Sequence, residues 1–398
     1  MKFNIFDKTV CADFVAIDSQ FPQKDPFGFR NVELNEYIKG INNFKAYTMY
    51  PMPSWGNAWF PWGYGVDRAT YNENKKGYLR FFKQNNKNIE YLNRRKRYSF
   101  KLAYSFFLAE TYVLLPFYEK NKIPFVFILY PGGAFGLHNI KSDQMLEGIF
   151  NSEYFRAVIV TQKITEDYLL EKKLCSKEKM HYIHGGFSQF NKEDIKQKKY
   201  FKKDKKTFDI CFVSGKYSEQ GKDKGYDLFI ESARELCKKA DDIRFHVVGG
   251  LTIEDIELGD IASKVTFYGY KKPEFLSSFY ASIDILLSPN RPSMLYEGNF
   301  DGFPLAIDAP FCGVAQFASD ELGMNRGQFI EEEEIVIVPL NAKSIAVKVL
   351  FYYNNPKKLY ELSEKGQIKT IKLFSIKQQA NERIKVFNKL VSLEMTKK

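Results

Sequence analysis

Two aspartates lie seven residues apart in the segment DGFPLAIDAPFCGVA, which runs from Asp301 to Ala315. Carboxylates at this spacing could work as an acid and a base, accept hydrogen bonds from the hydroxyl groups of a ligand, or be solvated charges. Pro304 suits the first position of a helix, where its missing N–H would be unpaired in any case. Pro310 would later remove a hydrogen bond and clash with a carbonyl group, so we expect a helix that is short or bent near this residue.

A second group of candidate residues follows the apolar stretch FDICFVSG, which predicts a strand that ends at Gly215. Lys216 and Lys224 lie in or beside the next loop, and Gly225 precedes a predicted helix. Backbone N–H groups at a helix start, together with two ammonium groups, suit the binding of a diphosphate. Lysines are also common in surface loops, so the pattern by itself fits an ordinary solvated loop equally well.

The N-terminal half contains a glycine-rich loop, YPGGAFGLHN, directly after a predicted buried strand. Gly132 and Gly133 would allow a ligand to approach the backbone closely. His138, one of only four histidines, lies at the end of this loop. A role at a site and the role of an ordinary loop residue are both open for His138.

Two series of strands and helices must position these residues. The first opens with a strand in CADFVAID, a helix capped by Asn31 and a strand in KAYTMY; a second helix is expected near Tyr78 to Phe82. Residues 93–115 are predicted to form one long helix with a basic start. The second series begins at FDICFVSG, and its strands end in VSGK, VVGG and FYGY. This alternation favours parallel α/β sheets, which bind ligands at the carboxyl ends of their strands.

Composition bounds the remaining possibilities. A chain of 398 residues is expected to form more than one domain. The net charge of +11 suggests an acidic partner, namely nucleic acid, an anionic membrane surface or a phosphorylated small molecule. The five cysteines form no C-x-x-C pair, which argues against a zinc site or a disulfide framework. No signal peptide or transmembrane segment is predicted, and a cytoplasmic location fits best.

The basic run Arg94–Arg97 precedes the predicted helix of residues 93–115. A basic, aromatic helix can contact a membrane surface, and a core helix with a solvated basic start has the same pattern. Both interpretations are open. No helix-turn-helix, zinc or RNA-recognition motif is present, which argues against a protein that binds nucleic acid.

Taken together, several motifs between Asp209 and Asp320 resemble the donor-binding domain of GT-B glycosyltransferases of the retaining family 4 type (glycosyl transferases group 1), in the bacterial polysaccharide and glycolipid branch. These motifs are FVSGK…DKGYDLFIES, FHVVGG, VTFYGY…FYASIDILLSPN and DGFPLAIDAPFCGVAQFASD. The N-terminal half is similar only in IPFVFILYPGGAF, AVIVTQ and MHYIHGGF, and LFSIKQQANERIKVFNKLV resembles the family's closing helix.

The resemblance implies an α/β protein of the GT-B fold, with two Rossmann-like domains, a cleft between them and a C-terminal helix that crosses back to the first domain. The expected domains are residues 1–190, which bind the acceptor, and residues 208–372, which bind the donor. The lysine-dense residues 191–207 are expected to be the linker, although a solvated helix face is an open alternative. Residues 373–398 are expected to pack on the first domain.

The resemblance also implies roles for single residues. In the family the segment that matches Asp301–Asp308 carries two glutamates eight positions apart, whereas here two aspartates are seven apart, so one residue is missing. Asp301 would face the donor sugar as a catalytic residue, with Glu297 as an alternative, and Asp308 would bind the ribose. His138 is the second catalytic candidate. The residues implied for the diphosphate are Lys216, Lys224, Gly215, Gly302, Phe303, Pro304 and Leu305. The loop of Tyr268 and Tyr270 would face the base, mainly through its backbone, and Gly132 and Gly133 would lie on the acceptor side.

The implied function is a glycosyltransferase that moves a sugar from a nucleotide sugar to a hydroxyl group of a glycan or lipid-linked acceptor, with retention, in bacterial surface polysaccharide or glycoconjugate synthesis. No metal or other cofactor is expected, in agreement with the lack of a D-x-D motif in an apolar setting. Such an enzyme would be cytoplasmic, with a peripheral contact at the inner membrane. The alternatives are a non-catalytic GT-B binding protein and a nucleotide-sugar epimerase, which would release the nucleotide without an acceptor.

Overall fold

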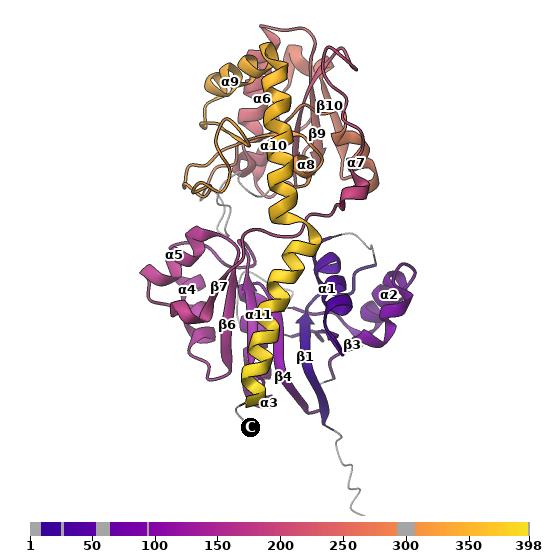
Figure 1. Ribbon diagram of the computed structural model, residues 1–398, viewed down its shortest axis with the longest axis vertical. Coiled ribbons are helices and arrows are strands. Elements are labelled where there is room, and N and C mark those ends of the chain that lie inside the picture. The colour runs from indigo at the N-terminus through magenta and orange to yellow at the C-terminus, as the bar shows by residue number, and fades with distance from the viewer. Residues whose placement is uncertain (1–8, 25–27, 53–63, 94, 293–306, 397–398) are drawn as a thin grey trace, which may run out of the picture. The chain divides into compact units, whose positions relative to one another are not determined.

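The computed structural model describes residues 9–24, 28–52, 64–93, 95–292 and 307–396 (Figure 1). The chain divides into two compact units, one formed by residues 1–187 with 376–398, and the other by residues 188–375. Unit 1 and unit 2 are described separately below. Among the described residues, no helix combines the length and the apolar character needed to cross a membrane.

Unit 1 is built on a parallel sheet of seven strands in the order β3-β2-β1-β4-β5-β6-β7. Its strands are β1 (Val10–Asp18), β2 (Lys45–Thr48), β3 (Ile89–Tyr91), β4 (Tyr98–Phe106), β5 (Phe125–Leu129), β6 (Phe155–Val160) and β7 (Met180–Tyr182). Its helices are α1 (Phe29–Gly40), α2 (Arg68–Tyr78), α3 (Leu108–Asn121), α4 (Ile140–Phe150), α5 (Lys163–Glu171) and α11 (Ile376–Thr396).

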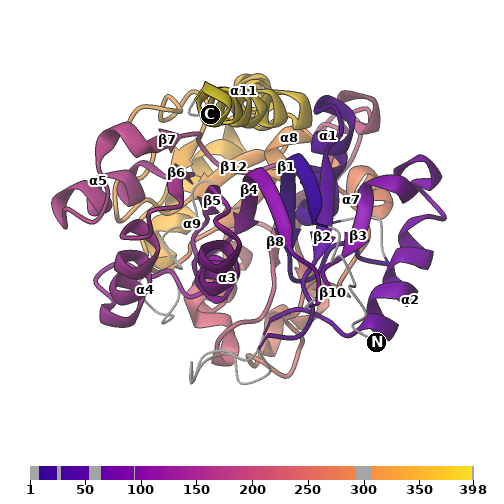
Figure 2. The ribbon, with the colours of Figure 1, turned by 90° about the horizontal axis from the view of Figure 1, so that it is seen from below.

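Helices cover both faces of this sheet. Figure 2 shows α1 and α11 together on one face, and α3 and α4 on the other. The core beneath α1 and α11 is aromatic, with Tyr37 of α1, Tyr104 of β4 and Phe387 of α11 in mutual contact. The C-terminal helix therefore returns to the first unit, as expected from the resemblance.

The prediction of one long helix over residues 93–115 is wrong. Residues 98–106 form β4, a central strand that pairs in parallel with β1 and β5, and helix α3 begins only at Leu108. A central parallel strand is buried on both faces, so its apolar run lacks the alternation that identifies a strand in sequence. The basic run Arg94–Arg97 thus precedes a strand, and the membrane-surface interpretation loses the helix on which it depended.

Two smaller predictions in unit 1 also need correction. Helix α1 starts at Phe29, with Gly28 as its N-cap residue. Asn31 lies inside the first turn instead, where its side-chain oxygen accepts a hydrogen bond from the backbone N–H of Gln23. The helix predicted near residues 78–82 is α2, which ends at Tyr78.

Unit 2 holds a parallel sheet of six strands in the order β10-β9-β8-β11-β12-β13. Its strands are β8 (Phe208–Ser214), β9 (Ile243–Gly249), β10 (Val265–Gly269), β11 (Ile285–Ser288), β12 (Ala315–Ala318) and β13 (Val336–Ile337). Its helices are α6 (Tyr226–Cys237), α7 (Pro273–Tyr280), α8 (Asp308–Phe311), α9 (Ala342–Asn354) and α10 (Pro356–Phe374). Among the described residues of both units, short 3₁₀ helices are formed by Lys83–Asn88, Lys177–Lys179, Lys192–Asp194, Glu219–Lys224 and Gly259–Lys264.

The lysine-dense residues 191–207 pack onto unit 2. Phe201 is buried in its hydrophobic core. The Nζ atom of Lys205 lies 2.6 Å from the carboxylate of Asp209 and 2.5 Å from that of Asp284. Burial and ion pairs therefore hold this segment on unit 2, and its assignment as the linker between two domains stays a prediction.

Candidate functional site

The carboxyl ends of β8, β9 and β10 form an edge of unit 2 that is rich in glycine, here called the glycine edge. Ser214 and Gly249 are partners in the β8–β9 register. Gly249 has a φ of 118°, and a Cβ atom there would overlap the carbonyl oxygen of Ser214. A Cβ atom on Gly250 would lie 2.9 Å from the backbone nitrogen of Lys216. The two strand ends are therefore packed closely enough to require glycine, and this is the edge where α/β sheets bind ligands.

Lys216 lies at this edge, directly after Gly215, and already has a counter-ion. Its Nζ atom is 2.5 Å from Oδ1 of Asp255, and its side chain is 44% exposed. Burial would raise the pKa of Asp255, but hydrogen bonds from Lys216 and from the backbone of Thr252 outweigh this effect and lower it. Asp255 is consequently a carboxylate, with which an anionic ligand of Lys216 must compete.

Lys224 and Gly225 form the entrance to helix α6. Gly225 has a φ of 72°, and a Cβ atom there would overlap the carbonyl oxygen of Pro289, which follows β11. The Nζ atom of Lys224 lies 3.8 Å from the carboxylate of Asp223 and 5.4 Å from the ring centre of Tyr217. Desolvation lowers the pKa of Lys224, and the charge of Asp223 partly opposes this shift. A partly desolvated ammonium beside a helix N-terminus can bind a phosphate group strongly.

Arg291 fixes the geometry of this entrance, and the sequence did not point to it. Its guanidinium binds both carboxylate oxygens of Asp227, in the first turn of α6, at 2.6 and 2.8 Å. It also donates to the carbonyl oxygen of Lys222 at 2.8 Å. The segment after β11 is thereby tied to the loop that carries Lys224. Asp227 and Arg291 are 64 residues apart, so no local pattern could have revealed the pair.

Several predicted site residues lie outside the described part of the chain. They are Asp301, Gly302, Phe303, Pro304, Leu305 and the alternative Glu297.

Asp308 is described and is fully engaged within unit 2. Its carboxylate accepts three hydrogen bonds at 3.0 Å, from the Ser188 hydroxyl and from the backbone and side-chain N–H groups of Gln189. Burial raises the pKa of Asp308, and these hydrogen bonds oppose the rise. Asp308 therefore anchors the first residues of unit 2 to helix α8, and its ribose role stays a prediction.

Helix α8 is short, in line with the expectation, but Pro310 does not end it. Pro310 is the third residue of α8, in the first turn, where a missing N–H costs little. The helix ends at Phe311, with Cys312 as its C-cap residue, followed by Gly313 with a φ of 80°.

The side chains of Tyr268 and Tyr270, whose loop is predicted to face the base, have different surroundings. The hydroxyl group of Tyr268 lies 3.0 Å from Nδ1 of His246, whose Nε2 atom is 2.8 Å from the carboxylate of Asp209. The side chain of Tyr268 thus belongs to a polar chain beside helix α7. Tyr270 is 75% exposed, and its hydroxyl group lies close above Gly250. Of these two tyrosines, Tyr270 is the one whose side chain is exposed at the glycine edge.

In unit 1, Gly132 and Gly133 have left-handed backbones, with φ values of 88° and 58°. His138 is exposed at the end of the same loop, where its ring meets the Tyr168 ring edge-on at 5.1 Å. His184 is bound to the Tyr182 hydroxyl group at 2.9 Å, and burial lowers its pKa to about 4. His184 is therefore neutral at physiological pH.

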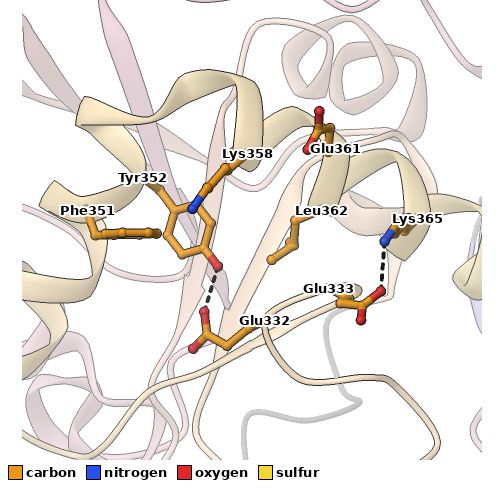
Figure 3. A pocket seen from close by; sticks show the side chains of 8 residues that line it. All are labelled: Glu332, Glu333, Phe351, Tyr352, Lys358, Glu361, Leu362 and Lys365. Carbon is orange, nitrogen blue, oxygen red and sulfur yellow. Dashed lines mark hydrogen bonds and ion pairs between the residues drawn. The ribbon is translucent and has the colours of Figure 1, made fainter.

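A separate hollow of about 330 Å³ lies on unit 2 between α9, α10 and the segment before β13 (Figure 3). Glu332 accepts a hydrogen bond from Tyr352 at 2.6 Å, and Glu333 pairs with Lys365 at 2.7 Å. These residues lie next to the start of β13, at the amino end of the parallel sheet and opposite the glycine edge. In the described part of the chain, no group of three or more His, Cys, Asp or Glu side chains could hold a metal ion.

Comparison with solved structures finds the same fold over nearly all of the chain. Sucrose-phosphate synthase from Thermosynechococcus elongatus is 16% identical with a TM-score of 0.64, over 96% of this chain and 100% of that one. Anabaena Alr3699/HepE in complex with UDP is 12% identical with a TM-score of 0.64, over 95% and 100%. A glycosyltransferase from Rickettsia africae is 14% identical with a TM-score of 0.59, over 96% and 99%. No curated protein sequence matches the chain.

The family model that matches is described as glycosyl transferases group 1, and the match covers residues 191–369. This segment contains the glycine edge, Lys216, Lys224 and Asp308, and nearly all of unit 2. The two parallel sheets and the returning helix α11 provide the GT-B fold around it. Residues 191–369 are therefore similar to glycosyl transferases group 1, and the chain has the GT-B fold.

Proposed function

We propose that the protein transfers a sugar from a nucleoside-diphosphate sugar to a hydroxyl group of a glycan or glycolipid acceptor, with retention of configuration. The observation that carries this proposal is the glycine edge, where Gly215 and Gly250 border Lys216 and the start of α6 lies beside Lys224. Two ammonium groups and a helix N-terminus can neutralise a diphosphate as it leaves. The work of catalysis would be positioning and charge stabilisation, with no metal required.

Relatives with the same fold support a nucleotide donor. Anabaena Alr3699/HepE has been solved with UDP and with UDP-glucose, and the pneumococcal O-GlcNAc transferase GtfA with UDP and GlcNAc. We extend this to a role in bacterial surface polysaccharide or glycoconjugate synthesis at the cytoplasmic face of the membrane. The strongly basic chain, with a net charge of +11, suits anionic donors and anionic surfaces.

The residue roles within this proposal are those that the resemblance implies. Lys216 and Lys224 hold the diphosphate together with the backbone of Gly302 to Leu305, and the loop of Tyr268 and Tyr270 faces the base, mainly through its backbone. Asp301 faces the donor sugar and His138 acts near the reacting groups. Asp308 meets the ribose only after exchanging one of the hydrogen bonds from Ser188 or Gln189.

The test is a product analysis with a panel of UDP-, GDP- and ADP-sugars. A transferase releases nucleoside diphosphate faster when an acceptor glycan is added, and the new glycosidic bond keeps the anomeric configuration of the donor, as read by proton NMR. Release at the same rate with and without acceptors, together with a free epimerised sugar, would instead support the epimerase alternative. Binding without any release would support the non-catalytic alternative.

A further inference from the structure

Three aromatic rings meet at the carboxyl edge of the sheet in unit 1. Phe29 follows β1, Phe107 follows β4 and Tyr130 follows β5, and these strands are neighbours in the sheet. The ring centres are 5.9 Å apart for Phe29 and Phe107, 6.0 Å for Phe29 and Tyr130, and 5.5 Å for Phe107 and Tyr130. We refer to Phe29, Phe107 and Tyr130 as the aromatic triad.

A buried guanidinium supports the triad from within the unit. The Cζ atom of Arg30 lies 5.5 Å from the ring centre of Phe29 and 5.3 Å from that of Phe107. Arg30 is 7% exposed and pairs with the carboxylates of Asp18 and Glu110. A cation held against two ring faces and neutralised by two carboxylates keeps these rings in place.

The third ring is held by a buried polar network. The Tyr130 hydroxyl group donates to Glu33 at 3.0 Å and accepts from Arg383 of α11 at 3.1 Å. Glu33 is fully buried and also accepts hydrogen bonds from Tyr37 and Tyr104 at 2.7 and 2.5 Å. A ring with a fixed hydroxyl group cannot rotate out of the triad without leaving buried partners unsatisfied.

The backbone around the triad is strained and leaves an open space. Phe107 has a φ of 57°, which is unfavourable for a bulky residue. A Cβ atom on Gly133 would lie 2.6 Å from the Phe107 side chain, so the glycine loop packs directly on this ring. At Gly132 a Cβ atom would meet nothing within 4 Å among the described residues. Strain of this kind is characteristic of binding sites, where surrounding structure compensates for it.

We propose that the aromatic triad binds a pyranose ring of the acceptor, beside the open space at Gly132. The proposal rests on the proposed function, in which the acceptor is a glycan or glycolipid. One face of a pyranose consists of C–H groups and packs on an aromatic ring, while its hydroxyl rim needs polar partners, which the backbone of the glycine loop offers. The triad rings are inclined to one another by 49° to 86°, and Phe29 is 38% exposed, so its ring is available for such a contact.

Saturation-transfer NMR on the full-length protein tests this proposal, because it detects weak sugar binding and identifies the protons in contact. The probes are methyl pyranosides of glucose, galactose, N-acetylglucosamine and mannose, with dodecyl maltoside as a lipid-like comparison. The variant is Phe29→Ala, and the matched control is Phe81→Ala, which removes another exposed phenylalanine of unit 1, 58% exposed. Gly132→Asn, which places a side chain in the open space with a residue type that tolerates a left-handed backbone, is the second variant.

We expect at least one methyl pyranoside to show transfer to its ring C–H protons in the wild type and in Phe81→Ala. The signal should fall at least fivefold in Phe29→Ala and in Gly132→Asn. Equal signals in Phe29→Ala and the wild type, or transfer only to the dodecyl chain, would overturn the proposal. The melting-point shift caused by UDP, GDP or ADP should be the same in all four proteins, and its absence from the wild type would count against the proposed function alone.

Discussion

At the scale of single residues, the diphosphate role depends on the ammonium group of Lys224. Burial lowers its pKa in the free protein, with partial opposition from Asp223. A bound diphosphate would favour the charged form and raise this pKa, so the complex holds more protons than the free protein. The affinity for the nucleotide must then fall as the pH rises through the lowered pKa of Lys224.

This pH dependence can be measured by titrating the preferred nucleoside diphosphate at several alkaline pH values. Lys224→Arg should remove the loss of affinity, because a guanidinium stays protonated throughout this range. Lys222→Arg, two residues away at an exposed position, should retain it. A Lys224→Arg variant that loses affinity as steeply as the wild type would show that Lys224 is not the group that titrates.

Asp308 makes a separate prediction about stability. An asparagine at this position has one side-chain oxygen and an N–H₂ group. The N–H₂ group would face the donors of Ser188 and Gln189, so at least one of these donors would lose its acceptor. Asp308→Asn should therefore lower the free energy of unfolding by about 1–3 kcal/mol in urea titrations. Asp241→Asn, at a fully exposed aspartate of unit 2, should change it by less than about 0.5 kcal/mol. Equal effects of the two substitutions on the free energy of unfolding would contradict the anchoring role of Asp308.

At the scale of elements, the glycine edge depends on close contact between the start of α6 and the segment after β11. Gly225 and Gly259 both have left-handed backbones, with φ values of 72° and 58°. A Cβ atom would overlap the carbonyl oxygen of Pro289 at Gly225, but would meet nothing within 4 Å at Gly259. A comparison of substitutions at Gly225 and Gly259 therefore separates the cost of backbone strain from the cost of the overlap with Pro289.

Alanine at either glycine should cost about 1–2 kcal/mol through the left-handed backbone. Gly225→Ala should cost clearly more, because α6 must also move away from Pro289, and it should weaken nucleotide binding. Urea unfolding and nucleotide titration of both variants measure these effects. If Gly225→Ala and Gly259→Ala proved alike in both measurements, the contact would have no role in shaping the site.

The sequence predicted the elements of unit 2 better than those of unit 1. In unit 2, β8 is followed by Gly215 and β9 ends at Gly249, and a helix with one apolar face separates them, so each boundary has a local signal. Residues 98–121 lack such a signal, because the central strand β4 and the helix α3 are both apolar and follow each other after the single residue Phe107. The change from strand to helix occurs at Phe107, which has a positive φ, and a phenylalanine does not predict this conformation.

Only those candidate site residues that lie in a local sequence pattern could be predicted. Gly215, Lys216 and Lys224 could be proposed as site residues because they follow a strand and precede a helix. The partners that determine their chemistry come from distant residues: Asp255 binds Lys216 across 39 positions, and Gln189 binds Asp308 across 119. The hydrogen bond between the Tyr268 hydroxyl group and His246 depends in the same way on the register of β9 and β10.

At the scale of the whole molecule, each unit has its own hydrophobic core. Tyr104 and Phe387 belong to the core of unit 1, and Phe229 and Phe317 to that of unit 2. We expect calorimetry to resolve two unfolding transitions. A nucleoside diphosphate at 100 times its dissociation constant should stabilise the transition of unit 2 by about 2.7 kcal/mol.

Asp308→Asn identifies that transition independently, because Asp308 and its partners lie in residues 188–375. The transition raised by the nucleotide should be the one lowered by this substitution. A nucleotide that raises the other transition, or a substitution that lowers the other one, would place nucleotide binding outside unit 2.

The central claim is that the glycine edge of unit 2 binds a nucleoside diphosphate through Lys224. Isothermal titration of UDP, GDP and ADP into the wild type, Lys224→Ala and Lys222→Ala tests it most directly. At least one nucleotide should bind the wild type, with an affinity at least tenfold weaker in Lys224→Ala, or about 1.4 kcal/mol, and within about twofold in Lys222→Ala. Equal affinities for the wild type and Lys224→Ala, or no binding of any nucleotide to the wild type, would contradict the claim.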